Sequence, residues 1–212
     1  MQIIADKNAF KLGLHIENFG KYKFFLSLLS FLILGMLFGA FAAKGISSIF
    51  DVVIKNWFES FLNFRKTSGF VSLFFSMFLT SFIFLLIISL SSFGISGIVI
   101  LPLLTMIRGF GTCLISGILY KEFSLSGIAF ADLILLPFCV ANDFLVVYIS
   151  GKGMELSLNF INIIKNVSAR GISLKPNVLA FLRKNLLCVL GSAVISLAEA
   201  MFTTCFIKYF NF

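Results

Sequence analysis

Four charged residues interrupt long apolar runs of this chain and are its first candidates for chemistry. Arg108 lies in the third apolar run, Asp132 and Asp143 lie in the fourth, and Glu199 lies in the last. A charge near the centre of a bilayer costs roughly 3 kcal/mol on insertion scales, so each of these residues needs a partner or a function. An arginine and a carboxylate together can form a buried ion pair or part of a path for ions or protons.

The depth of each residue within its run predicts which carboxylate pairs with Arg108. With a helical rise of about 1.5 Å per residue, Arg108 lies near the centre of its run and Glu199 about 4 Å outward of its own centre. By the same measure Asp132 lies about 8 Å outward and Asp143 about 8 Å inward. We therefore expect a structural pair of Arg108 with Glu199, with Asp132 as the second candidate. An ion path and a contact with a partner's transmembrane helix are the alternatives.

Composition decides the fold class that must hold these charges. The chain has 212 residues, of which 59% are hydrophobic and only 12% are charged, and its mean hydropathy is +1.06. An ordinary soluble domain is less than half apolar. We predict an all-α, polytopic membrane protein that forms a single domain over residues 1–212. Its net charge of +8 lies between the apolar runs, which indicates contact with the lipid bilayer and no nucleic-acid partner.

Five apolar runs are long enough to cross a hydrocarbon core of about 30 Å. We expect spans at about residues 24–43, 70–90, 95–119, 125–150 and 186–207. Pro102 in the third run and Pro137 in the fourth are predicted to break or soften their helices. A re-entrant hairpin over Ile95–Leu119 is therefore the alternative to a third full span.

Basic residues predict the orientation in the membrane. Residues 1–23 and 151–184 are both rich in lysine or arginine and are expected in the cytoplasm. Four spans between these two segments place both of them on the same side of the membrane. A re-entrant third run would leave three spans and would place one segment outside. We therefore favour five full spans in the cell membrane, with the N-terminus cytoplasmic and the C-terminus extracytoplasmic.

The segment 44–69 is predicted to be extracytoplasmic and to contain an amphipathic helix. Over residues 46–62 apolar side chains recur at intervals of three and four and charged ones occupy the opposite face. Trp57, Phe58 and Phe61 belong to the apolar face. This face is expected either to lie flat on the bilayer or to bind an extracytoplasmic partner.

Small residues predict where helices approach closely. Gly35 and Gly39 form a GxxxG pattern in the first span, and Gly109 and Gly111 follow Arg108 in the third. We favour packing within the chain over a contact between two copies for the GxxxG pattern, although a homo-oligomer is the alternative.

Motifs for catalysis or metal binding are not found in the sequence. It lacks HExxH, GxSxG and P-loop patterns, and its only histidine, His15, has no second ligand nearby. Its four cysteines lie inside apolar runs without paired spacing. We predict a protein that is not an enzyme and that has no catalytic residue, no cofactor and no metal.

The order of several small motifs resembles the stage II sporulation protein M family. Gly94, Gly97 and the pair Leu101-Pro102 lead to Arg108-Gly109. These residues are followed by the sequence Leu125-Ser-Gly and, ten residues later, by Pro137. The first and last spans are also similar to those of the family, through Gly35 to Ala40 and through Ile195 to Ala200, which includes Glu199.

Two departures from the family pattern bear on function. The family often has lysine at the position of Arg108, which keeps the charge. It usually has Pro-Gln-Asn where this chain reads Pro137-Phe138-Cys139. A role of that polar pair is therefore either absent here or has moved to Asn142.

The resemblance implies a membrane scaffold that acts during engulfment in endospore formation. Such a scaffold holds a lytic transglycosylase, stage II sporulation protein D, together with an amidase and endopeptidase, stage II sporulation protein P. These partners carry out the peptidoglycan remodelling. The alternative function is a transporter or an export permease subunit, in which the third span lines a substrate path and residues 151–184 contact an ATPase.

Overall fold

The computed structural model describes residues 2–45, 48–165 and 175–207. Side chains are described from Lys23 onward, except at 48–55, 124, 164–165 and 175. The elements in chain order are α1 (Gln2–Gly45), α2 (Ser48–Thr67), α3 (Phe70–Ser92), α4 (Gly97–Phe130), the π-helix η1 (Ala131–Leu135), α5 (Leu136–Lys165) and α6 (Lys175–Phe206). The described residues contain no strand and include five helical segments long and apolar enough to cross a membrane. This confirms the predicted all-α fold class and the number of spans.

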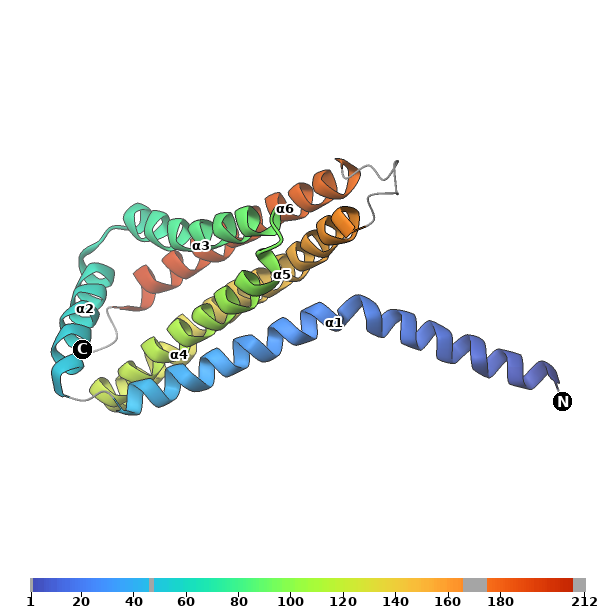
Figure 1. The fold of residues 1–212 in the computed structure, drawn as a ribbon. Coiled ribbons are helices and arrows are strands. Elements are labelled where there is room, and N and C mark those ends of the chain that lie inside the picture. Colours follow the sequence, from blue (N-terminus) through green and yellow to red (C-terminus); the bar gives the residue numbers. More distant parts are fainter. Residues whose placement is uncertain (1, 46–47, 166–174, 208–212) are drawn as a thin grey trace.

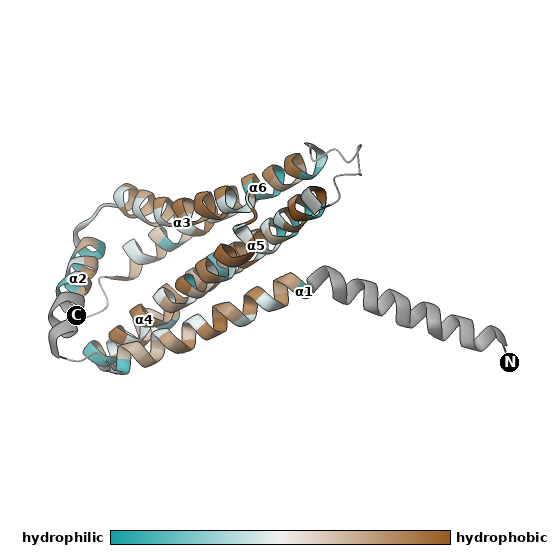
Figure 2. Ribbon diagram, in the orientation of Figure 1, coloured by the Kyte–Doolittle hydropathy of each residue, from teal (hydrophilic) through white to brown (hydrophobic). Residues whose placement is uncertain are grey.

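The surface and interior of the bundle have the polarity expected for a protein in lipid. Hydrophobic residues dominate the long helices, and hydrophilic ones gather on α2 and near the helix ends (Figure 2). Large apolar side chains such as Phe41, Val99 and Val194 are exposed. Several serines and threonines are instead buried, together with Asn142 and Asp143. The apolar surface therefore supports the prediction of a membrane protein, as the composition does.

Helix α5 holds the bundle together because it packs against α1, α3, α4 and α6. α1 packs along α4, and α3 packs along α6 (Figure 1). The turn between α3 and α4 lies beside α5 and α6, where the Ser157 hydroxyl donates to the Ser92 carbonyl and Phe93 meets Phe181 edge to face. We call this the Ser92 end of the bundle. α2 crosses the opposite end, between α1 and the start of α3 (Figure 1).

The chain reverses direction inside the helical segment α4. A Cβ atom at Gly127 would overlap the carbonyl oxygen of Leu119. Similarly, the Tyr120 hydroxyl donates a hydrogen bond to Asp132. In a straight helix the twelve residues from Tyr120 to Asp132 would separate these two residues by about 18 Å. The third and fourth candidate spans, Gly97–Phe123 and Leu125–Ile163, therefore form an antiparallel helical hairpin.

The third apolar run forms one helix long enough to cross a membrane, Gly97–Phe123, and not a helical hairpin. It begins at the Ser92 end and reaches the α2 end, where the Cβ of Ala43 would lie 2.6 Å from a Cβ added at Gly117. The prediction that Pro102 breaks this helix is wrong, because α4 continues through it. A proline there removes only the bond to Ile98, and the next turns keep their own hydrogen bonds.

Pro137 does not break its helix either. Pro137 is the second residue of α5, and α5 follows directly on η1. The backbone therefore changes from π-helical to α-helical hydrogen bonding without an interruption. Proline lacks the N–H that would bond the carbonyl of Leu133 in an α-helix. A wider π-helical turn just before the proline is consistent with that missing bond.

The fourth and fifth spans are longer than the sequence predicted. They extend over Leu125–Ile163 and Pro176–Phe206, so most of the expected cytoplasmic segment 151–184 belongs to two helices. The physical reason is packing. Gly151 lies against the backbone of Phe25, and Gly153 lies against Ser92. The rest of that segment, 166–174, lies outside the described residues.

Three of the four predicted packing glycines lie at close helix contacts. A Cβ at Gly35 would overlap the carbonyl oxygen of Met106, and one at Gly39 would overlap that of Phe110. From the other side, a Cβ at Gly109 would overlap the carbonyl oxygen of Leu32. The GxxxG pattern therefore serves α1–α4 packing within the chain. The prediction for Gly111 is wrong, because nothing lies within 4 Å of the position of its Cβ.

Helix α2 is present as predicted, but its apolar face is turned mainly toward the bundle. Phe58 is 2% exposed and contacts Phe123 with ring centroids 6.2 Å apart. Phe61 is half-buried against the same apolar cluster, whereas Trp57 remains exposed. The prediction that all three face a partner is therefore wrong for Phe58, since the end of the bundle is itself apolar, and it stays a prediction for Phe61 and Trp57. The predicted apolar residues 46–54 have side chains outside the described part.

The close contact of α1 with α4 makes a direct prediction. Gly35→Ala should lower the stability of the protein by roughly 1–3 kcal/mol, because the added methyl group meets backbone that must shift. Gly111→Ala is the matched control and should be neutral or stabilising by up to about 1 kcal/mol, since it adds helix propensity in open space. Thermal unfolding of the purified protein in detergent measures both, and equal effects would contradict the packing described.

Candidate functional site

Helix α2 is joined to the bundle by a buried ion pair. The Nη2 atom of Arg65 donates to Oε1 of Glu199 on α6 at 2.8 Å, and the two side chains are only 7% and 6% exposed. The Arg65 guanidinium also lies 4.6 Å from the centroid of the Phe61 ring. A charge pair so completely removed from water specifies one arrangement of its two helices, because either charge alone would be costly.

A second ion pair joins α4 to α5. Nε of Arg108 donates to Oδ1 of Asp143 at 2.8 Å, and Asp143 is 1% exposed. The hydroxyl oxygen of Thr112 lies 3.0 Å from the other carboxylate oxygen of Asp143. Both oxygens of this buried carboxylate therefore have a donor, which is the condition under which a buried charge is tolerated.

The predicted pair of Arg108 with Glu199 is therefore wrong, and so is the alternative with Asp132. The depth estimate used helix bounds that were too short. The observed fourth span, Leu125–Ile163, has its midpoint at residue 144, next to Asp143. The midpoint of Pro176–Phe206 is residue 191, which places Glu199 about 12 Å outward. With the correct bounds, depth alone would have selected Asp143.

Asp132 has a different role from the one expected. It is exposed on η1 and accepts the hydrogen bond from Tyr120 across the helical hairpin. This contact holds the two arms of the hairpin together near its turn. Asp132 is therefore not part of the buried ion pairs.

Arg65 is the residue of this site that sequence reasoning missed. Phe58, Leu62 and Arg65 are all buried and follow one another at intervals of four and three on α2, so Arg65 continues the apolar face of its helix. An arginine in line with an apolar face is a signal for a buried partner. The partner itself could not be named, because it comes from a helix more than 130 residues away.

The two ion pairs lie between two separate apolar clusters. One cluster includes Leu28, Leu101 and Val146, and the other includes Phe58, Ile118 and Leu135. Arg108 on α4, Asp143 on α5 and Glu199 on α6 each fall between the part of the helix that belongs to one cluster and the part that belongs to the other. The interior is therefore layered, with a polar layer between two apolar ones.

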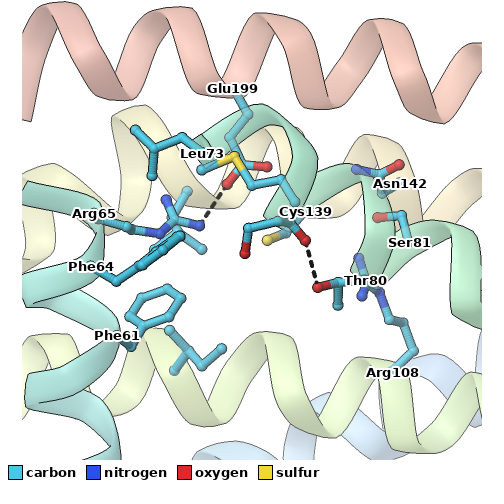
Figure 3. Close-up of a pocket in the computed structure, with 14 residues that line it drawn as sticks. Phe61, Phe64, Arg65, Leu73, Thr80, Ser81, Arg108, Cys139, Asn142 and Glu199 are labelled. Carbon is cyan, nitrogen blue, oxygen red and sulfur yellow. Dashed lines mark hydrogen bonds and ion pairs between the residues drawn. The ribbon is translucent and has the colours of Figure 1, made fainter. Parts of the chain in front are cut away.

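A cavity of about 160 Å³ opens within this polar layer. Figure 3 shows Arg65 and Glu199 on one side, Arg108, Ser81 and Asn142 on the other, and Cys139 between them. One water needs roughly 10–15 Å³ on this measure, so the cavity has room for several waters or for a small ligand. It is lined by side chains from α2, α3, α4, η1, α5 and α6.

The described part of the chain holds no arrangement of side chains for metal binding and no disulfide. No group of three or more histidine, cysteine, aspartate or glutamate residues lies close enough there to hold a metal ion. The four cysteines are free thiols, of which Cys188 is buried and Cys205 is exposed. His15 has a side chain outside the described residues.

The fold and this site define a multi-pass helical membrane protein with two buried ion pairs around a polar cavity. Comparison with known proteins adds no family to this class. The chain matches no family model, no curated protein and no solved structure.

The pairing makes a quantitative prediction for double-mutant cycles. Arg108→Gln and Arg65→Gln should each lower stability by roughly 3–5 kcal/mol, because each leaves a buried carboxylate without its partner. Adding Asp143→Asn to the first, or Glu199→Gln to the second, should recover much of the loss. The cross-combination of Arg108→Gln with Glu199→Gln should recover little. Chemical denaturation in detergent measures the stability of each variant. If the largest recovery came from Arg108→Gln with Glu199→Gln, the pairing predicted from the sequence would be right after all.

Proposed function

We propose that this chain is a non-enzymatic scaffold in the cell membrane that organises a peptidoglycan-degrading complex during engulfment in endospore formation. The proposal rests on the resemblance to the stage II sporulation protein M family. In it, stage II sporulation proteins D and P supply the catalysis, and this chain holds them together.

The position of α2 is the structural observation that favours a scaffold. Its inner face is held by Phe58 and by the ion pair of Arg65 with Glu199. Trp57 lies at the edge of that face, exposed at one end of the bundle and stacked on Phe61 with ring centroids 5.8 Å apart. An exposed tryptophan at the rim of an apolar face is a typical anchor of a protein–protein interface.

Co-purification tests this proposal. The protein co-expressed with the D and P hydrolases should retain them through detergent extraction, and Trp57→Glu should lower the retained amount by at least about tenfold, because the anchor residue becomes charged. Arg183→Glu is the matched control, since Arg183 is exposed on α6 toward its other end. Failure of the unaltered protein to retain either hydrolase would count against the scaffold.

The proposed orientation places the α2 end outside the cell and the Ser92 end in the cytoplasm. It is supported by Lys152, Arg183 and Lys184, which lie near the Ser92 end, where α5 ends and α6 begins, because cytoplasmic segments are enriched in basic residues.

Reporter fusions test the orientation. A reporter active only outside the cytoplasm should be active when fused after Glu122 and inactive when fused after Gly171. A reporter active only inside should give the opposite result. Cytoplasmic activity after Glu122 would overturn the orientation and leave the fold unchanged.

A transporter or permease subunit is the second candidate function, and the polar cavity favours it. Two arginines and a glutamate line a space in the middle of the bundle, which is where transporters bind their substrates. Reversal of the charges of Arg108 and Asp143 separates the two functions. A reversed pair that restores both folding and function supports a structural clamp, whereas one that folds without function supports a path.

A further inference from the structure

The cavity in the polar layer has more hydrogen-bond donors than its surroundings use. A guanidinium group carries five N–H donors. Arg65 and Arg108 each make one ion pair within the part of the chain that the structure describes. Within the same described part, Nη1 of Arg65 is buried without a hydrogen-bond acceptor. Arg108 uses its Nε atom for Asp143, and no hydrogen bond between described residues uses its two Nη groups.

The charges around the cavity balance, so the unused donors are what would hold a ligand. Among the described residues, Arg65, Arg108 and Glu199 line the cavity, and Asp143 lies 2.8 Å from Nε of Arg108. The two arginines and the two carboxylates therefore sum to no net charge. Asn142 and Ser81 add an amide and a hydroxyl that can donate further hydrogen bonds.

The cavity can also be reached from the surface of the bundle. Ser76 and Thr80 line it and are exposed on α3, and Phe64 lines it from α2 and is 39% exposed. The cavity therefore opens at the surface of the bundle between α2 and α3. Its volume of about 160 Å³ suits a small ligand.

From these observations we infer that the cavity is a binding site for a small oxyanion or carboxylate, held between the guanidinium groups of Arg65 and Arg108. Such an anion supplies acceptors to the guanidinium donors that the described residues leave unused, and hydrogen bonds between two charged groups are the strong ones. Planar carboxylates and phosphate match the fork of a guanidinium group, which favours these anions over chloride. The site does not depend on the scaffold proposal, because its ligand binds without any partner protein.

Ligand-dependent thermal stability is the first test. The full chain in neutral detergent is titrated with formate, acetate and phosphate at constant ionic strength, with chloride as an anion that does not match the fork of a guanidinium group. The oxyanions should raise the melting temperature in a saturable way, by about 3–5 °C at tenfold excess over Kd, and chloride should not. An equal rise with chloride would mean a general salt effect and would overturn the site.

Paired neutral variants locate the effect. Arg108→Gln with Asp143→Asn, and Arg65→Gln with Glu199→Gln, each remove an ion pair without leaving a lone buried charge, so folding is preserved. Both should lose the anion-dependent rise. Lys152→Gln with Glu155→Gln is the matched control, because this pair lines a different cavity. It should keep the full rise, and a loss in all three variants would contradict the assignment.

Cys139 provides a second measurement that does not depend on stability. It lines the cavity between the two arginines (Figure 3). In a protein with Cys113, Cys188 and Cys205 replaced by alanine, the rate at which a small thiol reagent modifies Cys139 should fall at least about fivefold when the anion is bound. The paired variant of Arg108 should show no such protection.

The anion could be free in solution or carried by a lipid headgroup, and nanodiscs separate the two sources. If phosphatidylglycerol protects Cys139 and raises the melting temperature relative to phosphatidylcholine, while free anions do not, the ligand is lipid-borne. Dependence on Arg108 is required in either case. The inference is overturned if neither free anions nor phosphatidylglycerol changes the melting temperature or the reactivity of Cys139.

Discussion

The arrangement of the helices depends on the pairing of four buried charged side chains that lie between two apolar clusters. Arg65 with Glu199 and Arg108 with Asp143 are each paired at 2.8 Å with little access to water. Either member alone would carry the full cost of a desolvated charge, so the helices that bear them must keep their relative depth and rotation. These two contacts therefore position α2 on α6 and α4 on α5.

The polar layer explains why the bundle is ordered as it is. The apolar clusters above and below it would tolerate sliding and rotation of helices, since lipid-like side chains are interchangeable in a hydrocarbon environment. Close backbone contacts at Gly35, Gly39 and Gly109 limit this freedom for α1 and α4. The ion pairs limit it for α2, α5 and α6. Small residues and charges thus divide the work of specifying a single arrangement.

The same layer connects structure with function. A polar cavity beside buried arginines is compatible with a rigid scaffold and with a ligand-binding site, because both need charged side chains that are fixed in place. α2 lies at the junction of the two. Its inner face closes the cavity through Arg65 and Phe61, and Trp57 is exposed at the edge of that face. A ligand in the cavity would therefore act on the helix that the scaffold proposal assigns to partners.

The sequence by itself determined the all-α class, the five spans, the amphipathic helix and three of the four packing glycines, because hydropathy and small residues act locally along the chain. It also identified Arg108 as a charge that needs a partner. Only the tertiary structure decided that this partner is Asp143 and that Glu199 binds Arg65. Pairing depends on where each helix begins and ends and on which face it turns inward. The fourth candidate span continues beyond its apolar run, through the packing contacts of Gly151 and Gly153, and its midpoint therefore lies at residue 144, next to Asp143.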